Sequence, residues 1–178
     1  MKENQVKKLV MAAMCVALEI VLPMAFHTIQ NAGSIFLPMH IPVLICGLLC
    51  GWQYGLICGI LAPVLSSLFT GMPPAAILPA MLCELAVYGL ITGICVYGIH
   101  TEKQIVKIYG SLITAMLAGR IVSGILKALI FNVGEYSFKI FITSSFLTGI
   151  PGILIQLIFI PVIVLALQKA GIAEPKRR

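Results

Sequence analysis

Six long apolar runs fill almost the whole of this 178-residue chain and leave little polar sequence between them. The runs cover residues 9–26, 35–50, 54–70, 76–99, 106–131 and 143–169. A helix needs about 20 apolar residues to cross the ~30 Å hydrocarbon core of a bilayer, so these runs predict membrane spans. The predicted fold is an all-α integral membrane protein: a six-transmembrane-helix bundle that forms one membrane domain over residues 1–178.

The basic residues predict the orientation of this bundle. Only 10% of the chain is charged, whereas a soluble domain carries about 25%. Nine of the 12 Lys and Arg residues flank span ends that share one side if six spans alternate: Lys2, Lys7, Lys8, Lys103, Lys107, Lys169, Lys176, Arg177 and Arg178. Cytoplasmic loops carry the excess of Lys and Arg, so both termini are predicted to be cytoplasmic. The net charge of +6 is therefore attributed to the membrane and not to nucleic acid.

Missing motifs exclude most catalytic classes. The chain contains no Asp, no GxxxxGK[ST] phosphate-binding loop, no HExxH and no GxSxG, so it has neither an ATPase motif nor a recognisable catalytic centre. All six cysteines lie in apolar runs, and no CxxC pair occurs among them. We expect buried packing thiols, no metal site and no cofactor held by this chain.

Ionisable residues at membrane depth are costly and are therefore candidates for function. Glu84 and Arg120 are predicted to lie in the outer half to the middle of the bilayer, on the fourth and fifth spans. They could form a structural Arg–Glu clamp, or one or both could face a ligand cavity. Lys127, two turns beyond Arg120, either snorkels to headgroups or lies at the mouth of that cavity. Glu19 lies toward the outer half of the first span, with no assigned role.

Further polar residues favour the same half of the bundle. Tyr88 follows Glu84 by one helical turn and shares its face. His40 and Asn132 lie near outer span ends, and Ser123 and Gln156 add hydrogen-bonding capacity to the last two spans. The predicted ligand site comprises Glu84, Arg120, Lys127, Tyr88, Asn132 and His40, and it binds a small polar molecule captured from outside.

An ordered set of short motifs gives the chain a family resemblance. The motifs are Ala13-x-x-x-Ala17, Leu37-Pro38-Met39-His40-Ile41-Pro42, the glycines from Gly47 to Gly55, Ala62-Pro63-Val64-Leu65-Ser66-Ser67, Thr70-Gly71-Met72-Pro73-Pro74, and Glu84-Leu85-Ala86-Val87-Tyr88-Gly89. With the length and the six predicted spans, this set resembles the substrate-binding (S) components of energy-coupling-factor (ECF) vitamin transporters, over nearly the whole chain.

The resemblance implies a transport subunit of the bacterial plasma membrane and not an enzyme. Such a subunit associates with a transmembrane coupling subunit and with two ATPase subunits, which use the ATP. By resemblance, Ala13 and Ala17 form the docking surface for the coupling subunit. The vitamin site lies near the outer face, under the outer loops and between helices four to six, and toppling of the bundle is the transport step.

The substrate follows less directly from the residues. Arg120 and Lys127 suit a carboxylate, because Arg can grip one bidentately, and this favours pantothenate. If Glu84 neutralises Arg120, a pyridoxine-like or hydroxymethylpyrimidine-like ligand becomes as good a candidate. Two other classes compete with the importer subunit: a stand-alone secondary carrier with Glu19 or Glu84 as a proton site, and a small membrane-embedded enzyme.

Overall fold

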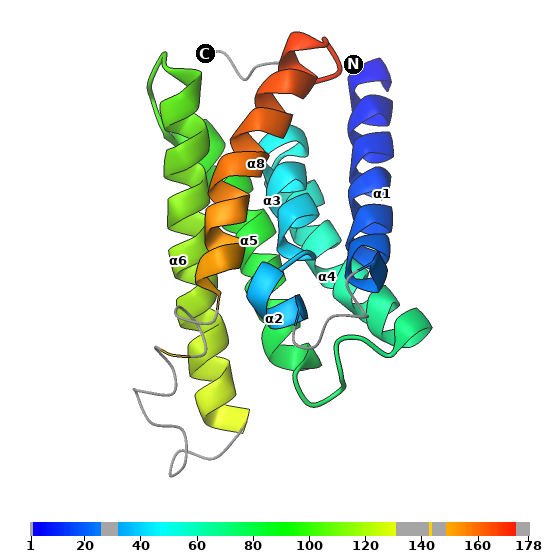
Figure 1. The fold of residues 1–178 in the computed structure, drawn as a ribbon. Helices are drawn as coiled ribbons and strands as arrows, with labels where there is room; N and C mark the ends of the chain where they lie inside the picture. Colours follow the sequence, from blue (N-terminus) through cyan, green and yellow to red (C-terminus); the bar gives the residue numbers. More distant parts are fainter. Residues whose placement is uncertain (1, 26–31, 131–142, 144–148, 174–178) are drawn as a thin grey trace.

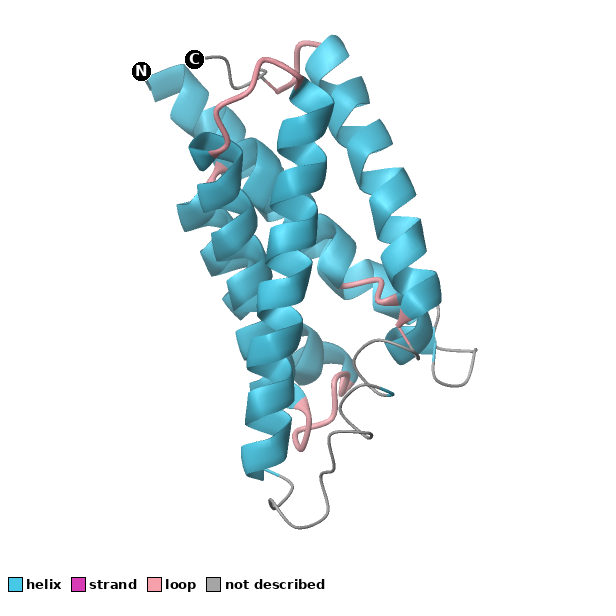
Figure 2. Cartoon of the chain, turned by 90° about the vertical axis from the view of Figure 1, so that its left-hand side faces the viewer, coloured by secondary structure: helices cyan, strands magenta, loops and turns pink. Residues whose placement is uncertain are grey.

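The computed structural model describes residues 2–25, 32–130, 143 and 149–173, and every regular element in this part of the chain is helical. The helices are α1 (Lys2–Ala25), α2 (Ala32–Phe36), α3 (His40–Cys50), α4 (Trp52–Thr70), α5 (Leu78–Gly98), α6 (Gln104–Ile130) and α8 (Ile150–Lys169). They run up and down one axis, and α1 begins at the end of the bundle where α8 finishes (Figures 1 and 2). In the described residues, five helices are long and apolar enough to cross a membrane: α1, α4, α5, α6 and α8.

The second predicted span is wrong as a continuous helix over residues 35–50. α2 ends at Phe36, and α3 begins only at His40. Between them Leu37 has a positive φ of 51°, and Pro38 has no N–H to donate to a continuing helix. The 11 residues of α3 span about 16 Å at 1.5 Å per residue, which is too short for a bilayer core. α2, the break and α3 together occupy the place of the predicted span.

The last predicted span, residues 143–169, also begins later than expected. Helix α8 starts at Ile150, with Pro151 in its first turn, where a missing N–H costs nothing. Residues 144–148 lie outside the described part of the chain. The other boundaries agree with the apolar runs within a few residues, apart from α1, which starts at Lys2.

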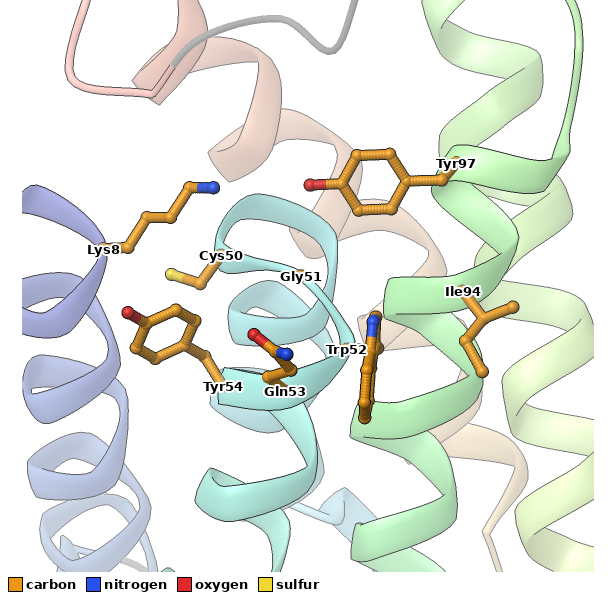
Figure 3. A pocket seen from close by; sticks show the side chains of 8 residues that line it. All are labelled: Lys8, Cys50, Gly51, Trp52, Gln53, Tyr54, Ile94 and Tyr97. Atoms are coloured by element: carbon orange, nitrogen blue, oxygen red, sulfur yellow. The ribbon is translucent and has the colours of Figure 1, made fainter. Parts of the chain in front are cut away.

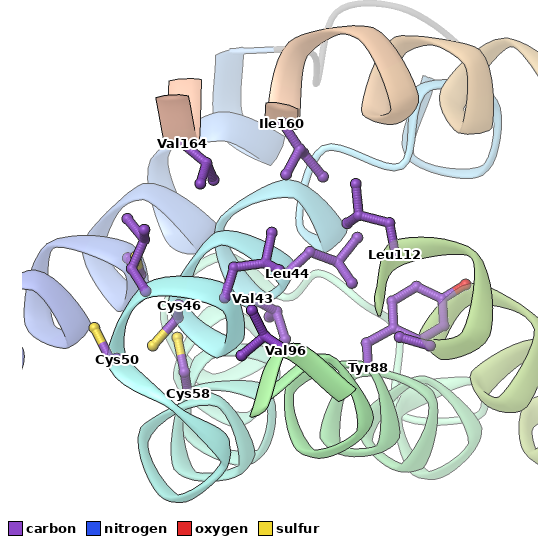
Figure 4. Packing of buried hydrophobic residues seen from close by; sticks show 14 of the residues in the cluster. Val43, Leu44, Cys46, Cys50, Cys58, Tyr88, Val96, Leu112, Ile160 and Val164 are labelled. Carbon is purple, nitrogen blue, oxygen red and sulfur yellow. The ribbon is translucent and has the colours of Figure 1, made fainter. Parts of the chain in front are cut away.

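The short helix α3 forms the centre of the bundle. It packs against α1, α4, α5 and α8, and nine of its 11 residues are buried. Val43 and Leu44 are fully buried beside Leu112 of α6 and Ile160 of α8 (Figure 4). The outer helix faces are apolar and exposed instead, as at Leu68 (74%) and Leu129 (67%). This distribution fits a bundle surrounded by lipid, where apolar surface has no reason to be buried.

Glycines allow α4 and α5 to approach at backbone distance. A Cβ on Gly89 would overlap the carbonyl of Gly55, and a Cβ on Gly93 would overlap the backbone of Trp52. Gly51 alone links α3 to α4, at φ 104°, a conformation that L side chains rarely adopt. These glycines therefore set both the close α4–α5 packing and the one-residue turn after Cys50.

Candidate functional site

Glu84 is the centre of a buried polar cluster built by three helices. Its Oε1 atom lies 3.4 Å from His40 Nε2 at the start of α3 and 3.4 Å from Arg120 Nε on α6. Tyr88, one turn further along α5, donates its hydroxyl to the same oxygen at 3.3 Å. All four residues are at most 4% exposed. The structure thus brings together four of the six residues predicted from the sequence.

Local packing explains why these side chains meet. Glu84 and Tyr88 are four residues apart and share the inner face of α5. The ring of His40 packs edge-on against that of Tyr88, with centroids 5.2 Å apart. The Tyr88 ring occupies the space where a Cβ on Gly119 would lie. Because Gly119 lets α6 approach Tyr88 so closely, the next residue, Arg120, is brought to Glu84.

Arg120 is paired loosely and retains hydrogen-bonding capacity. Its Nε lies within ion-pair distance of Glu84, but the geometry does not make a hydrogen bond, and neither Nε nor Nη2 has a hydrogen-bond partner among the described residues. Gly149, just before α8, leaves room for the guanidinium, since a Cβ there would lie 3.1 Å from Nη2. One predicted alternative was a structural Arg120–Glu84 clamp. The structure shows this pair as a contact between one atom of each residue, Nε and Oε1, and not as a bidentate ion pair.

Two further buried polar atoms lie on the neighbouring helices. Ser123 Oγ, three residues after Arg120 on α6, has no hydrogen-bond partner in the described chain, and neither does Gln156 Oε1 on α8. Both residues are 1% exposed. Gln156 Nε2 donates to the carbonyl of Leu37 at 3.5 Å, which ties α8 to the break between α2 and α3. The sequence shows only that both residues are polar. The structure shows that both are buried, Ser123 near Arg120 on α6 and Gln156 against the break between α2 and α3.

Of the two remaining predicted ligand residues, Lys127 is described and lies further along α6. Lys127 is in the last turn of α6 and is half-buried. Asn132 and the predicted outer loop over 132–139 are outside the described residues, as is most of the loop after α1. The connection from Thr70 to Pro74 is described: Gly71 ends α4 in the left-handed conformation, and Ser67 Oγ donates to the carbonyl of Pro73 at 2.9 Å.

Glu19 belongs to a different part of the bundle. It is fully buried between α1 and α4, where Cys58 Sγ donates to its Oε1 at 2.8 Å. The thiol of Cys58 is therefore buried, as expected, but it has a carboxylate as its hydrogen-bond partner. Within the described residues, no group of three or more His, Cys, Asp or Glu side chains is placed to hold a metal ion.

Ala13 and Ala17 lie on the outer face of α1 and are exposed. The opposite face of the helix, with Ala12, Cys15 and Glu19, packs into the bundle. The two alanines therefore leave a shallow strip on the surface, separate from the Glu84 cluster.

The fold and this cluster define a multi-pass membrane protein with a buried, incompletely paired polar centre. A family model, ECF transporter substrate-specific component, matches residues 7–167. The chain therefore belongs to the family of substrate-specific components of ECF transporters, which are transport subunits and not enzymes. Neither the curated proteins nor the solved structures contain a significant match to this chain.

Proposed function

We propose that this chain binds and translocates a small water-soluble vitamin, or a vitamin precursor, for an ATP-driven importer of the bacterial plasma membrane. The observation that carries the proposal is the set of buried polar atoms without partners on the helices that form the Glu84 cluster and on the neighbouring α8: Arg120 Nε and Nη2, His40 Nδ1, Ser123 Oγ and Gln156 Oε1. Buried polar groups are normally hydrogen-bonded, because an unsatisfied one costs about 1–3 kcal/mol. A polar ligand among α3, α5, α6 and α8 would satisfy these atoms.

The charges around this set favour an anionic ligand. Arg120 and Lys127 contribute two positive charges and Glu84 one negative charge, so one positive charge remains before His40 is counted. A carboxylate on the ligand would complete the guanidinium that Glu84 touches only through Nε. Pantothenate, which carries a carboxylate together with hydroxyl and amide groups, is our first candidate. Pyridoxine and hydroxymethylpyrimidine follow, because a tighter Glu84–Arg120 pair would neutralise Arg120 and leave no guanidinium for a ligand carboxylate.

The same proposal includes the partners. Because this sequence has no ATP-binding motif, ATP must be used by partner proteins, and we propose that these are a coupling subunit and two ATPase subunits. Ala13 and Ala17 are the proposed docking strip, and both termini are proposed to be cytoplasmic. The ligand would then enter from the end of the bundle at which α6 finishes, near Lys127.

The direct test is to purify the full chain and identify any retained small molecule by mass spectrometry. Titration calorimetry with pantothenate, pyridoxine and hydroxymethylpyrimidine then ranks the candidates. With pantothenate, Arg120→Lys should weaken binding about ten- to hundredfold, because losing a charge-assisted hydrogen bond costs about 1.5–3 kcal/mol. Equal affinity for the three compounds, or none for any, would contradict the substrate assignment.

A double substitution separates the clamp from the ligand contact. If Arg120 serves only to hold Glu84, the Arg120→Met, Glu84→Met pair should fold and bind as the parent does, because apolar replacement of a buried ion pair is often neutral. If Arg120 contacts the ligand, the double variant should fold but lose pantothenate. Measuring unfolding and affinity on the same preparation distinguishes the two.

A further inference from the structure

A polar hollow lies at the opposite end of the bundle from the Glu84 cluster, near the start of α1. It has a volume of about 440 Å³ and is lined mainly by Lys8, Trp52, Gln53, Tyr54, Ile94 and Tyr97. These residues come from α1, α4 and α5 (Figure 3). The amino group of Lys8 and the hydroxyl of Tyr97 point toward each other across it, above the side chains of Gln53 and Trp52.

The hollow has an excess of positive charge and of hydrogen-bond donors. No Asp or Glu is among its lining residues, and no ion pair joins Lys8 to a described carboxylate. The Lys8 ammonium, the Trp52 indole N–H, the Gln53 amide and the Tyr54 hydroxyl can all donate hydrogen bonds. This combination suits a phosphate group, which is an acceptor with negative charge.

The setting of the hollow points to a lipid as the source of that phosphate. Trp52 and Tyr97 are 44% and 52% exposed, as expected for rings at a membrane interface. Further along α4, Ile57, Ile60 and Leu61 are exposed and continue the outer surface toward the bilayer centre. An acyl chain can lie along these residues while its headgroup occupies the hollow.

The predicted docking strip faces elsewhere. At 100° per residue, Ala13 and Ala17 lie about 140–180° around α1 from Lys8. Lys8 instead continues the inward face of Ala12 and Cys15, both of which are buried. A partner helix lying on the alanines would therefore leave the hollow open to lipid.

We propose that this hollow binds the phosphate headgroup of an anionic phospholipid, in the leaflet on the side of the chain termini. It is a lipid site that holds α1, α4 and α5 at the membrane interface, distinct from the ligand site near Glu84. Loss of vitamin binding would leave this proposal untouched, because the two sites share no residue.

The single tryptophan of the chain provides a local probe, since Trp52 lines the hollow. The full chain is reconstituted in vesicles that contain brominated phosphatidylglycerol or brominated phosphatidylcholine, and quenching of Trp52 fluorescence is measured. We expect phosphatidylglycerol to quench more strongly at equal bromine content. Lys8→Gln should reduce that preference about fivefold, the value of one Lys near an anionic surface. Tyr97→Phe should reduce it less.

The matched control is Lys7→Gln, which removes the same charge from the neighbouring, exposed position outside the hollow. It should reduce the preference less than Lys8→Gln does, because Lys7 attracts the surface without lining the hollow. Equal quenching by the two lipids, or an equal effect of Lys7→Gln and Lys8→Gln, would overturn the proposal. Relief of quenching by inorganic phosphate at constant ionic strength would assign the hollow to free phosphate. If there is no lipid preference and Lys8→Gln no longer co-purifies with the coupling subunit, the hollow binds a protein partner instead.

Discussion

Single buried atoms carry most of the functional information in this protein. Glu84 Oε1 is approached by three side chains, whereas Arg120 Nη2, Ser123 Oγ and Gln156 Oε1 have no partner in the described chain. In a low-dielectric interior such atoms cost stability, so their persistence is best explained by a function. An apolar replacement of similar size should therefore lower the stability of the fold if the polar residue has a structural role. If the residue binds the ligand, the replacement should lower the ligand affinity and leave the stability unchanged or raised.

Gln156→Met tests this distinction. Removing an unsatisfied buried amide should leave the unfolding midpoint unchanged or raised, since only the long contact to Leu37 is lost. If Gln156 Oε1 accepts a hydrogen bond from the ligand, affinity should fall about tenfold. Calorimetry and thermal unfolding in the same detergent give both values.

The control is Gln168→Met on the same helix, where Gln104 Nε2 donates to Gln168 at 3.2 Å near the end of α8. This change should not affect ligand affinity. A Gln156 variant that unfolds earlier but binds normally would show that the amide is structural.

The helices differ in how they use their small residues. On α4 and α5 the glycines face each other and set the backbone separation, whereas on α1 the two alanines face outward. Small residues at one-turn spacing serve close helix packing in either case. On α4 and α5 the partner helix belongs to this chain, and for α1 we propose a helix of another chain.

Gly89→Ala should destabilise the bundle by about 1–3 kcal/mol, because its Cβ would overlap the backbone carbonyl of Gly55 and only a shift of a whole helix relieves the overlap. Gly98→Ala, at the end of the same helix, meets nothing within 4 Å and should be neutral or slightly stabilising. Unfolding in a detergent series compares them. Equal stabilities would contradict the close α4–α5 packing.

Ala13→Leu with Ala17→Leu should abolish co-purification with the coupling subunit and leave ligand affinity intact. The added side chains fill the strip on α1 without touching the Glu84 cluster. Ala166→Leu, an exposed alanine on α8, is the matched control and should retain the complex. Lost ligand binding with a preserved complex would move the alanines into the ligand site.

At the scale of the whole molecule, the two chain ends and the connection between α5 and α6 share one end of the bundle. Most of the basic residues belong to these segments. The Glu84 cluster, which is the proposed ligand site, and the proposed lipid hollow lie toward opposite ends of the bundle. This arrangement suits the proposal of solute binding on one side and anchoring on the other.

Cysteine labelling checks this orientation. Met72→Cys, in the exposed turn after α4, should react with a membrane-impermeant maleimide on intact cells. Glu102→Cys, in the exposed connection before α6, should react only after permeabilisation. The parent chain supplies the background, since its six thiols are buried or half-buried. The reverse pattern would invert the bundle and place the ligand site on the inside.

The sequence by itself determined the membrane class, most helix boundaries and the polar residues worth attention. Hydropathy and helical spacing are local properties, and so Glu84 with Tyr88, or Ala13 with Ala17, can be placed on one face without knowing the fold. The family resemblance that rested on these motifs is confirmed over residues 7–167. What the sequence left open was whether Glu84 and Arg120 meet, and what else surrounds them.

Only the tertiary structure decided those points. The left-handed Leu37 shortens α3 and places His40 at Glu84, and Gly119 admits the Tyr88 ring so that Arg120 can follow. The Glu19–Cys58 contact joins residues 39 positions apart. Such contacts depend on the rotation and separation of neighbouring helices, which are set by packing across the bundle and leave no trace in the periodicity of any single helix.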